Sequence, residues 1–203
     1  MCSRLPRVRL QRDVELPAPR LTLFDWPGLL GPVVHVPDLL APDLRLVESL
    51  AAALAPDYRV VSLQPRSPAR GAGYQLHAAD VLATLDQFGF ERPVLLGQRL
   101  GALVATLVAA WAPGRPAGLV LVDPLVAVEA ASDMPGPPLE VCALRDCPPD
   151  WLALGRRVAC PVLMLASHGL LDDRLNDALP SARTATLSVD AVHTFLERLQ
   201  RSC

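Results

Sequence analysis

Residues 93–102, PVLLGQRLGA, place a short apolar run directly before a Gly-x-Arg-x-Gly turn. The apolar run predicts a buried strand, and residues 100–111, which follow at once, predict an apolar helix. Gly97 and Gly101 flank Arg99, and small residues at such positions allow a strand to turn sharply into a helix. The stretch therefore predicts a tight strand-to-helix turn with Arg99 at its centre.

On both sides of this turn, short apolar runs alternate with longer segments of helical period, which is typical of βαβ units with a buried parallel sheet. Before them, residues 7–16 and 20–25 alternate apolar and polar side chains, which predicts an antiparallel edge hairpin. We therefore predict a single doubly wound α/β domain over residues 1–203. The predicted strands are 32–36, 59–63, 94–96, 118–122, 161–166 and 183–189, and the predicted helices are 43–54, 75–88, 100–111, 172–179 and 191–201.

From about Arg9 to Gln200 the chain resembles the α/β-hydrolase family, and the 97–101 turn resembles that family's nucleophile elbow, GxSxG. The resemblance implies a mostly parallel sheet with an N-terminal antiparallel hairpin and a cap, here reduced to an insertion over residues 125–158. Other segments resemble family elements in the same order. Val33-Val-His35 resembles the strand before the oxyanion segment, and residues 57–61 resemble the next strand. Residues 118–124 resemble the strand after the elbow helix, residues 160–172 resemble the strand and loop that deliver the acid, and residues 193–197 resemble the histidine loop.

Two departures from the family bear on function. Arg99 occupies the position of the family nucleophile, and a guanidinium with a pKa above about 12 cannot attack a carbonyl carbon. Covalent acyl transfer at the turn is therefore excluded. Val36 and Pro37 follow His35 where the family has a glycine, and proline has no N–H to donate to an oxyanion.

Arg99 itself admits several interpretations. It could form an ion pair with a remaining carboxylate such as Asp172 or Asp123, or it could extend into solvent. Alternatively, it could bind an anion, because unpaired N–H groups and the dipole of the following helix already favour negative charge there. Such a ligand site would comprise Arg99, Leu100, His35, Val36 and Gln98.

The resemblance also implies an acid at Asp172, or at its neighbour Asp173, and a base at His193. Such a dyad can abstract a proton or activate water without a nucleophilic serine. The alternative is structural: His193 lies near the start of the last helix, and the aspartates cap the helix before it. Whether the chain is an enzyme is therefore open. It is either a non-catalytic or ligand-binding homologue, or a noncovalent hydrolase, lyase or isomerase that uses the dyad with Arg99 as anion binder.

Three further residues carry weaker expectations. His35 is expected to order the loop after its strand or to line a ligand pocket. His77 is expected on the solvent face or in the first turn of its helix. Cys160 is expected to be a buried, unreactive thiol.

Composition limits the partners. The net charge is −2, which argues against nucleic-acid binding. All 19 basic residues are arginine, which excludes lysine chemistry. The five cysteines show no metal-ligand spacing, so no metal site is expected. No cofactor is expected. No apolar run is long enough to span a membrane, and we expect a cytoplasmic protein. The expected partner is a small acyl or carboxylate-bearing molecule, with a homo-oligomer as a further possibility.

Overall fold

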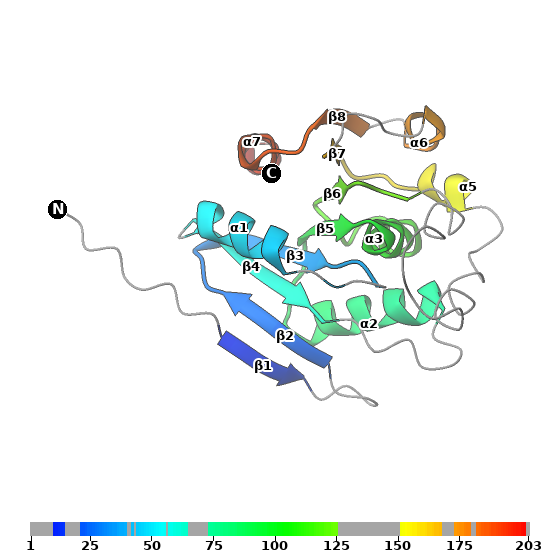
Figure 1. Cartoon of the computed structure of the whole chain (residues 1–203). Coiled ribbons are helices and arrows are strands. Elements are labelled where there is room, and N and C mark those ends of the chain that lie inside the picture. Colours follow the sequence, from blue (N-terminus) through cyan, green and yellow to red (C-terminus); the bar gives the residue numbers. More distant parts are fainter. Residues whose placement is uncertain are drawn as a thin grey trace.

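A computed structural model describes residues 10–14, 21–39, 42, 44–55, 57–64, 73–125, 151–167, 173–179 and 182–201. Within them, eight strands form one sheet in the order β1-β2-β4-β3-β5-β6-β7-β8 (Figure 1). The strands are β1 Leu10–Val14, β2 Leu21–Trp26, β3 Leu30–Val36, β4 Tyr58–Leu63, β5 Val94–Gln98, β6 Gly118–Val122, β7 Val162–Ala166 and β8 Ala182–Thr186. The helices are α1 Arg45–Leu54, α2 Tyr74–Gln87, α3 Leu100–Trp111, α5 Trp151–Gly155, α6 Asp173–Ala178 and α7 Val189–Arg201.

The sheet is mostly parallel. β1 and β2 form an antiparallel pair at one edge, β2 runs antiparallel to β4, and every pairing from β4 to β8 is parallel. The predicted α/β class and the N-terminal hairpin are thus confirmed. β3 lies between β4 and β5, with Val36 level with Gly97. The loop after β3 therefore emerges beside the 97–101 turn.

Helices cover both faces of the sheet. α1 and α7 pack on one face, and α2 and α3 pack on the other, each with its own cluster of buried apolar side chains (Figure 1). α3 is buried along almost its whole length, from Leu100 to Ala110. This agrees with its sequence, which is apolar on all sides and therefore typical of a helix enclosed by other elements. None of the helices within the described ranges is long and apolar enough to cross a bilayer.

The C-terminal boundary differs from the prediction. β8 ends at Thr186 and α7 begins at Val189, whereas the sequence predicts a strand to residue 189 and a helix from 191. The physical reason is a cap: the Ser188 hydroxyl oxygen accepts a hydrogen bond from the Ala191 N–H at 3.2 Å. His193 lies within the last helix in the structure, as it does in the predicted helix 191–201.

The predicted insertion, 125–158, falls largely outside the described residues. Its described part is Leu125 and residues 151–158, which include the short helix α5 next to α3. The role of this segment as a reduced cap stays a prediction.

Candidate functional site

Arg99 stands at the sharp turn between β5 and α3 with a φ of 50° and a ψ of −110°. Residues other than glycine rarely adopt this backbone conformation, which costs about 1–3 kcal/mol. The two flanking glycines are required by close approach. A Cβ on Gly97 would lie 2.5 Å from the Ala102 Cα, and one on Gly101 would collide with the Val36 carbonyl oxygen. The chain thus presents the Arg99 side chain at the carboxyl ends of the parallel strands.

The Arg99 side chain forms an ion pair with Asp38. Its Nε donates a hydrogen bond to Asp38 Oδ2 at 3.0 Å. The Asp38 side chain is 2% exposed, whereas that of Arg99 is 32% exposed. Asp38 lies just after β3, and the neighbouring ends of β3 and β5 bring the two charges together. A buried carboxylate at the turn is thereby neutralised by a partly exposed guanidinium.

The predicted partners of Arg99 were different. Asp172 lies outside the described residues. Asp123 binds Ser167 instead, accepting hydrogen bonds from its backbone N–H at 2.7 Å and from its hydroxyl at 2.5 Å. The partner that the sequence did not suggest is Asp38, whose distance of 61 residues along the chain from Arg99 gives no local signal.

The other residues of the predicted anion site are mostly inaccessible. Leu100, His35 and Val36 are buried, and Gln98 is half-buried. The carbonyl oxygens of Val36 and Pro37 approach Gly101 closely. Of the five predicted ligand residues, Arg99 and Gln98 are therefore those that reach the surface.

The His35 side chain is buried, and it is hydrogen-bonded to Ser62, a partner that the sequence did not suggest. Its Nδ1 lies 2.8 Å from the Ser62 hydroxyl oxygen, and both residues are fully buried. Burial lowers the pKa of His35 to about 4, and the neighbouring Gln98 side chain opposes this shift. His35 is therefore neutral at pH 7 and joins β3 to β4. The signal that could have found Ser62 is strand register, which places it opposite His35.

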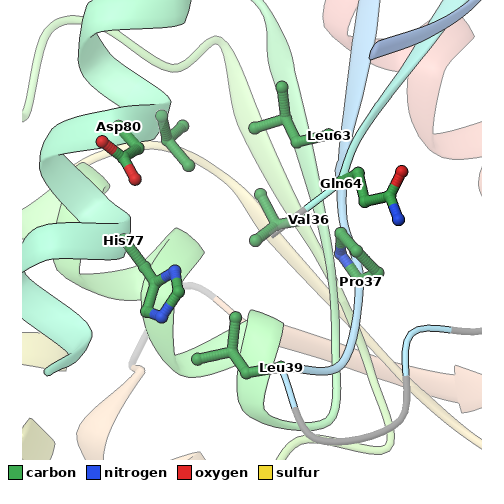
Figure 2. Close-up of a pocket in the computed structure, with 8 residues that line it drawn as sticks. Val36, Pro37, Leu39, Leu63, Gln64, His77 and Asp80 are labelled. Atoms are coloured by element: carbon green, nitrogen blue, oxygen red, sulfur yellow. The ribbon is translucent and has the colours of Figure 1, made fainter. Parts of the chain in front are cut away.

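A cavity of about 20 Å³ lies between α2 and the ends of β3 and β4, large enough for about one water molecule (Figure 2). His77 and Asp80 line it from α2, with Val36, Leu39 and Gln64 among the residues opposite. Both α2 side chains are buried. A solvent-facing His77 is therefore wrong, although the residue does lie in the first turn of its helix.

Cys160 is buried, as expected for a small apolar residue, and burial raises the pKa of its thiol to about 11. At neutral pH the thiol therefore stays protonated and is a poor nucleophile.

The His193 imidazole interacts with its own helix and with the start of β4. Its Nδ1 lies 3.4 Å from Glu197 Oε1, and its ring packs edge-to-face against Tyr58 with the ring centroids 6.0 Å apart. His193 thus lies near the start of α7, as the structural alternative expects. Its role in a catalytic dyad stays a prediction.

Strand register shows how far His193 lies from the turn. Val60 of β4 and Val94 of β5 both pair with Val33 of β3, so the two residues lie at the same level of the sheet. Tyr58 lies two residues before Val60, and Arg99 lies five residues after Val94. Seven strand residues at about 3.3 Å each separate Tyr58 from Arg99 by about 23 Å along the sheet. The structure therefore places His193 near the amino ends of the parallel strands and Arg99 at their carboxyl ends. Asp172 and the side chain of Asp173, between which the predicted acid position is shared, lie outside the described residues.

Within the described parts of the chain, no group of three or more histidine, cysteine, aspartate or glutamate side chains is arranged to hold a metal ion.

No protein-family model matches the sequence. Many solved structures nevertheless share the arrangement of its elements. A thermophilic esterase from Thermogutta terrifontis, solved with malate bound, has a TM-score of 0.73 and 17% identity over 95% of this chain and 99% of its own. A structure from a study of carboxylesterases of the thaumarchaeon Nitrososphaera gargenis has a TM-score of 0.73 and 13% identity over 95% and 100%.

A third similar structure is the N-formylmaleamic acid deformylase of Pseudomonas putida, solved as a serine-to-alanine variant. It has a TM-score of 0.70 and 17% identity over 87% of this chain and 92% of its own. At these identities the likeness establishes the fold.

Proposed function

We propose that this chain, which has the α/β-hydrolase fold, is a non-catalytic hydrolase-like protein in which an ion pair takes the place of nucleophilic chemistry. The observation that carries the proposal is the Arg99–Asp38 pair at the sharp turn. Asp38 is buried and needs a cation, and Arg99 supplies it. Arg99 therefore has a structural role at the turn, because it neutralises Asp38.

The surroundings support this proposal. Acyl transfer requires an attacking oxygen or sulfur, a base within hydrogen-bond reach and N–H donors for the oxyanion. Arg99 offers no nucleophile, and His193 lies near the amino ends of the strands, away from the turn. Ser62 and His35 do form a serine–histidine pair, but both are fully buried.

The test is covalent labelling and turnover. The protein is incubated with short-chain aryl esters and with a fluorophosphonate, alongside an active serine hydrolase as reagent control. We expect neither turnover nor an adduct in the intact mass. Arg99→Ser should remain inactive, because it creates a hydroxyl without placing a base beside it.

Two outcomes would contradict the proposal. A fluorophosphonate adduct on any serine of the unmodified chain would show a working nucleophile. Turnover without an adduct, abolished by His193→Ala, would support the noncovalent hydrolase, lyase or isomerase instead. Circular dichroism of each variant checks that it is folded.

A second candidate function is the binding of a small carboxylate at Arg99. The observation that favours it is the 32% exposure of the guanidinium at the carboxyl ends of the strands, where open α/β sheets commonly bind ligands. Two similar structures concern molecules of this class, namely malate and N-formylmaleamic acid.

This second function is tested by titrating acetate and malate into the protein and following backbone amide shifts by NMR. Binding at Arg99 should shift residues 97–101 and be lost in Arg99→Gln. Arg115→Gln is a matched control, because Arg115 is also 32% exposed and also paired with an aspartate. Equal shifts in all three proteins would exclude a site at Arg99.

A further inference from the structure

A larger cavity lies at the amino ends of the parallel strands, away from the turn at Arg99. Its volume is about 320 Å³, and α7 closes it against the first residues of β3, β4 and β5. This volume is at the lower end of the range typical of small-molecule sites. Its walls are largely apolar, formed by Leu30, Pro32, Val94, Ala117, Leu196 and Leu199.

Apolar surface is exposed to water around this cavity. Leu30, in its wall, is 41% exposed, and the preceding Leu29 is 90% exposed. These are two of the four large apolar side chains that are exposed in the described part of the chain. Covering such surface with an apolar molecule is favourable at about 25 cal/mol per Å² removed from water. The cavity therefore favours a ligand with an apolar body.

The polar side chains that line the cavity indicate which polar group the ligand carries. Arg92 lies in the lining and is exposed, and within the described residues its guanidinium has neither an ion pair nor a hydrogen bond. Tyr58 also lines the cavity. Burial, Glu197 and Asp57 all raise the pKa of its phenol, so that the hydroxyl stays protonated at neutral pH.

Of the two acids beside Tyr58, Glu197 is already paired, and Asp57 is exposed to solvent. Glu197 lies 3.4 Å from His193 Nδ1 through one oxygen and 3.6 Å from an Arg201 nitrogen through the other. The Arg201 guanidinium therefore partly offsets the negative charge of Glu197 within α7. Arg92 is the lining residue that carries a positive charge.

We propose that this cavity binds a small amphipathic carboxylate, with its apolar chain or ring between α7 and the starts of β3 and β5 and its carboxylate paired with Arg92. A guanidinium recognises a carboxylate by charge and by its planar donor geometry. The Arg99–Asp38 pair lies at the carboxyl ends of the strands, so this site is independent of that pair. The site does not depend on the proposed function.

The test compares octanoate with octanamide, which has the same chain without the charge, by isothermal titration below their aggregation concentrations. Octanoate should bind about tenfold more tightly than octanamide, as expected for one partly exposed charge-assisted contact. Arg92→Gln should remove this difference. The matched control Arg156→Gln, which removes an exposed charge just after α5, should keep it.

A second variant fills the cavity. A Cβ on Gly31 would meet no atom within 4 Å, so Gly31→Phe can be introduced without a backbone clash. It should abolish binding of both molecules. Gly114→Phe is the control, because a Cβ there also meets nothing and the residue lies outside the cavity. The proposal is overturned if the unmodified chain does not bind octanoate, if Gly31→Phe binds it unchanged, or if Arg92→Gln keeps the preference for octanoate.

Discussion

A single residue, Arg99, combines an unfavourable backbone conformation with a favourable charge contact. Its positive φ costs about 1–3 kcal/mol, while its guanidinium neutralises the buried Asp38. Removing one partner of a buried ion pair costs about 3–5 kcal/mol, because the other charge is left without compensation. The two residues therefore depend on each other, and the contact with Asp38 offsets part of the strain at the turn.

The strain at residue 99 can be measured separately from the charge. Arg99→Ala and Arg99→Gly both remove the ion pair, but only glycine adopts a positive φ without steric cost. We expect Arg99→Gly to be more stable than Arg99→Ala by about 1 kcal/mol in urea unfolding, after the greater unfolded-state entropy of glycine is included. A glycine variant that is less stable than the alanine variant would mean that the turn is not strained.

His35 gives the protein a sensitivity to acid. Its pKa is about 4 in the folded chain, against an ordinary value near 6.5. Between these values the unfolded chain binds more protons, so the free energy of unfolding decreases as the pH falls, and it approaches its full value above pH 6.5. The loss amounts to about 3 kcal/mol by pH 4.

This dependence is checked by urea unfolding of the unmodified chain and His35→Asn at pH 7, 6, 5 and 4. The difference in unfolding free energy between the two proteins should shrink steadily as the pH falls. A difference that stays constant from pH 7 to pH 4 would show that His35 does not remain neutral in the folded state.

At the scale of elements, some could be predicted closely from sequence and others could not. α3 and β6 have the predicted bounds, because each is a continuous apolar segment enclosed on all sides. β8 and α7 do not, because β8 is a half-exposed edge strand with mixed residues, and its end is decided by the hydroxyl of Ser188. His193 lies inside the last helix with either start, so this shift of two residues does not by itself change where the candidate base lies.

The cap at Ser188 is open to a direct test. Ser188→Ala removes the acceptor for the Ala191 N–H and should lower stability by about 1 kcal/mol. Ser188→Asp, which keeps an acceptor and adds a negative charge at the helix N-terminus, should be at least as stable as the natural chain. An alanine variant of unchanged stability would mean that another group begins α7.

At the scale of the whole molecule, sheet topology decides which residues meet. The placement of β3 between β4 and β5 brings Asp38 to Arg99, and His193 on α7 lies near the amino ends of the parallel strands. Hydrophobic pattern predicted the fold class and the turn, because both follow from local periodicity. It could not predict the Asp38 contact or the cavity beneath α7, because these depend on how distant segments pack.

Arg99 and Asp38 are expected to stabilise each other at the turn. Unfolding free energies of the natural chain, Arg99→Gln, Asp38→Asn and the double variant test this as a double-mutant cycle. We predict that each single variant loses about 3 kcal/mol and that the double variant loses about 2 kcal/mol less than the two losses added together. Strictly additive losses would contradict a stabilising pair, because they would mean that the two charges do not interact.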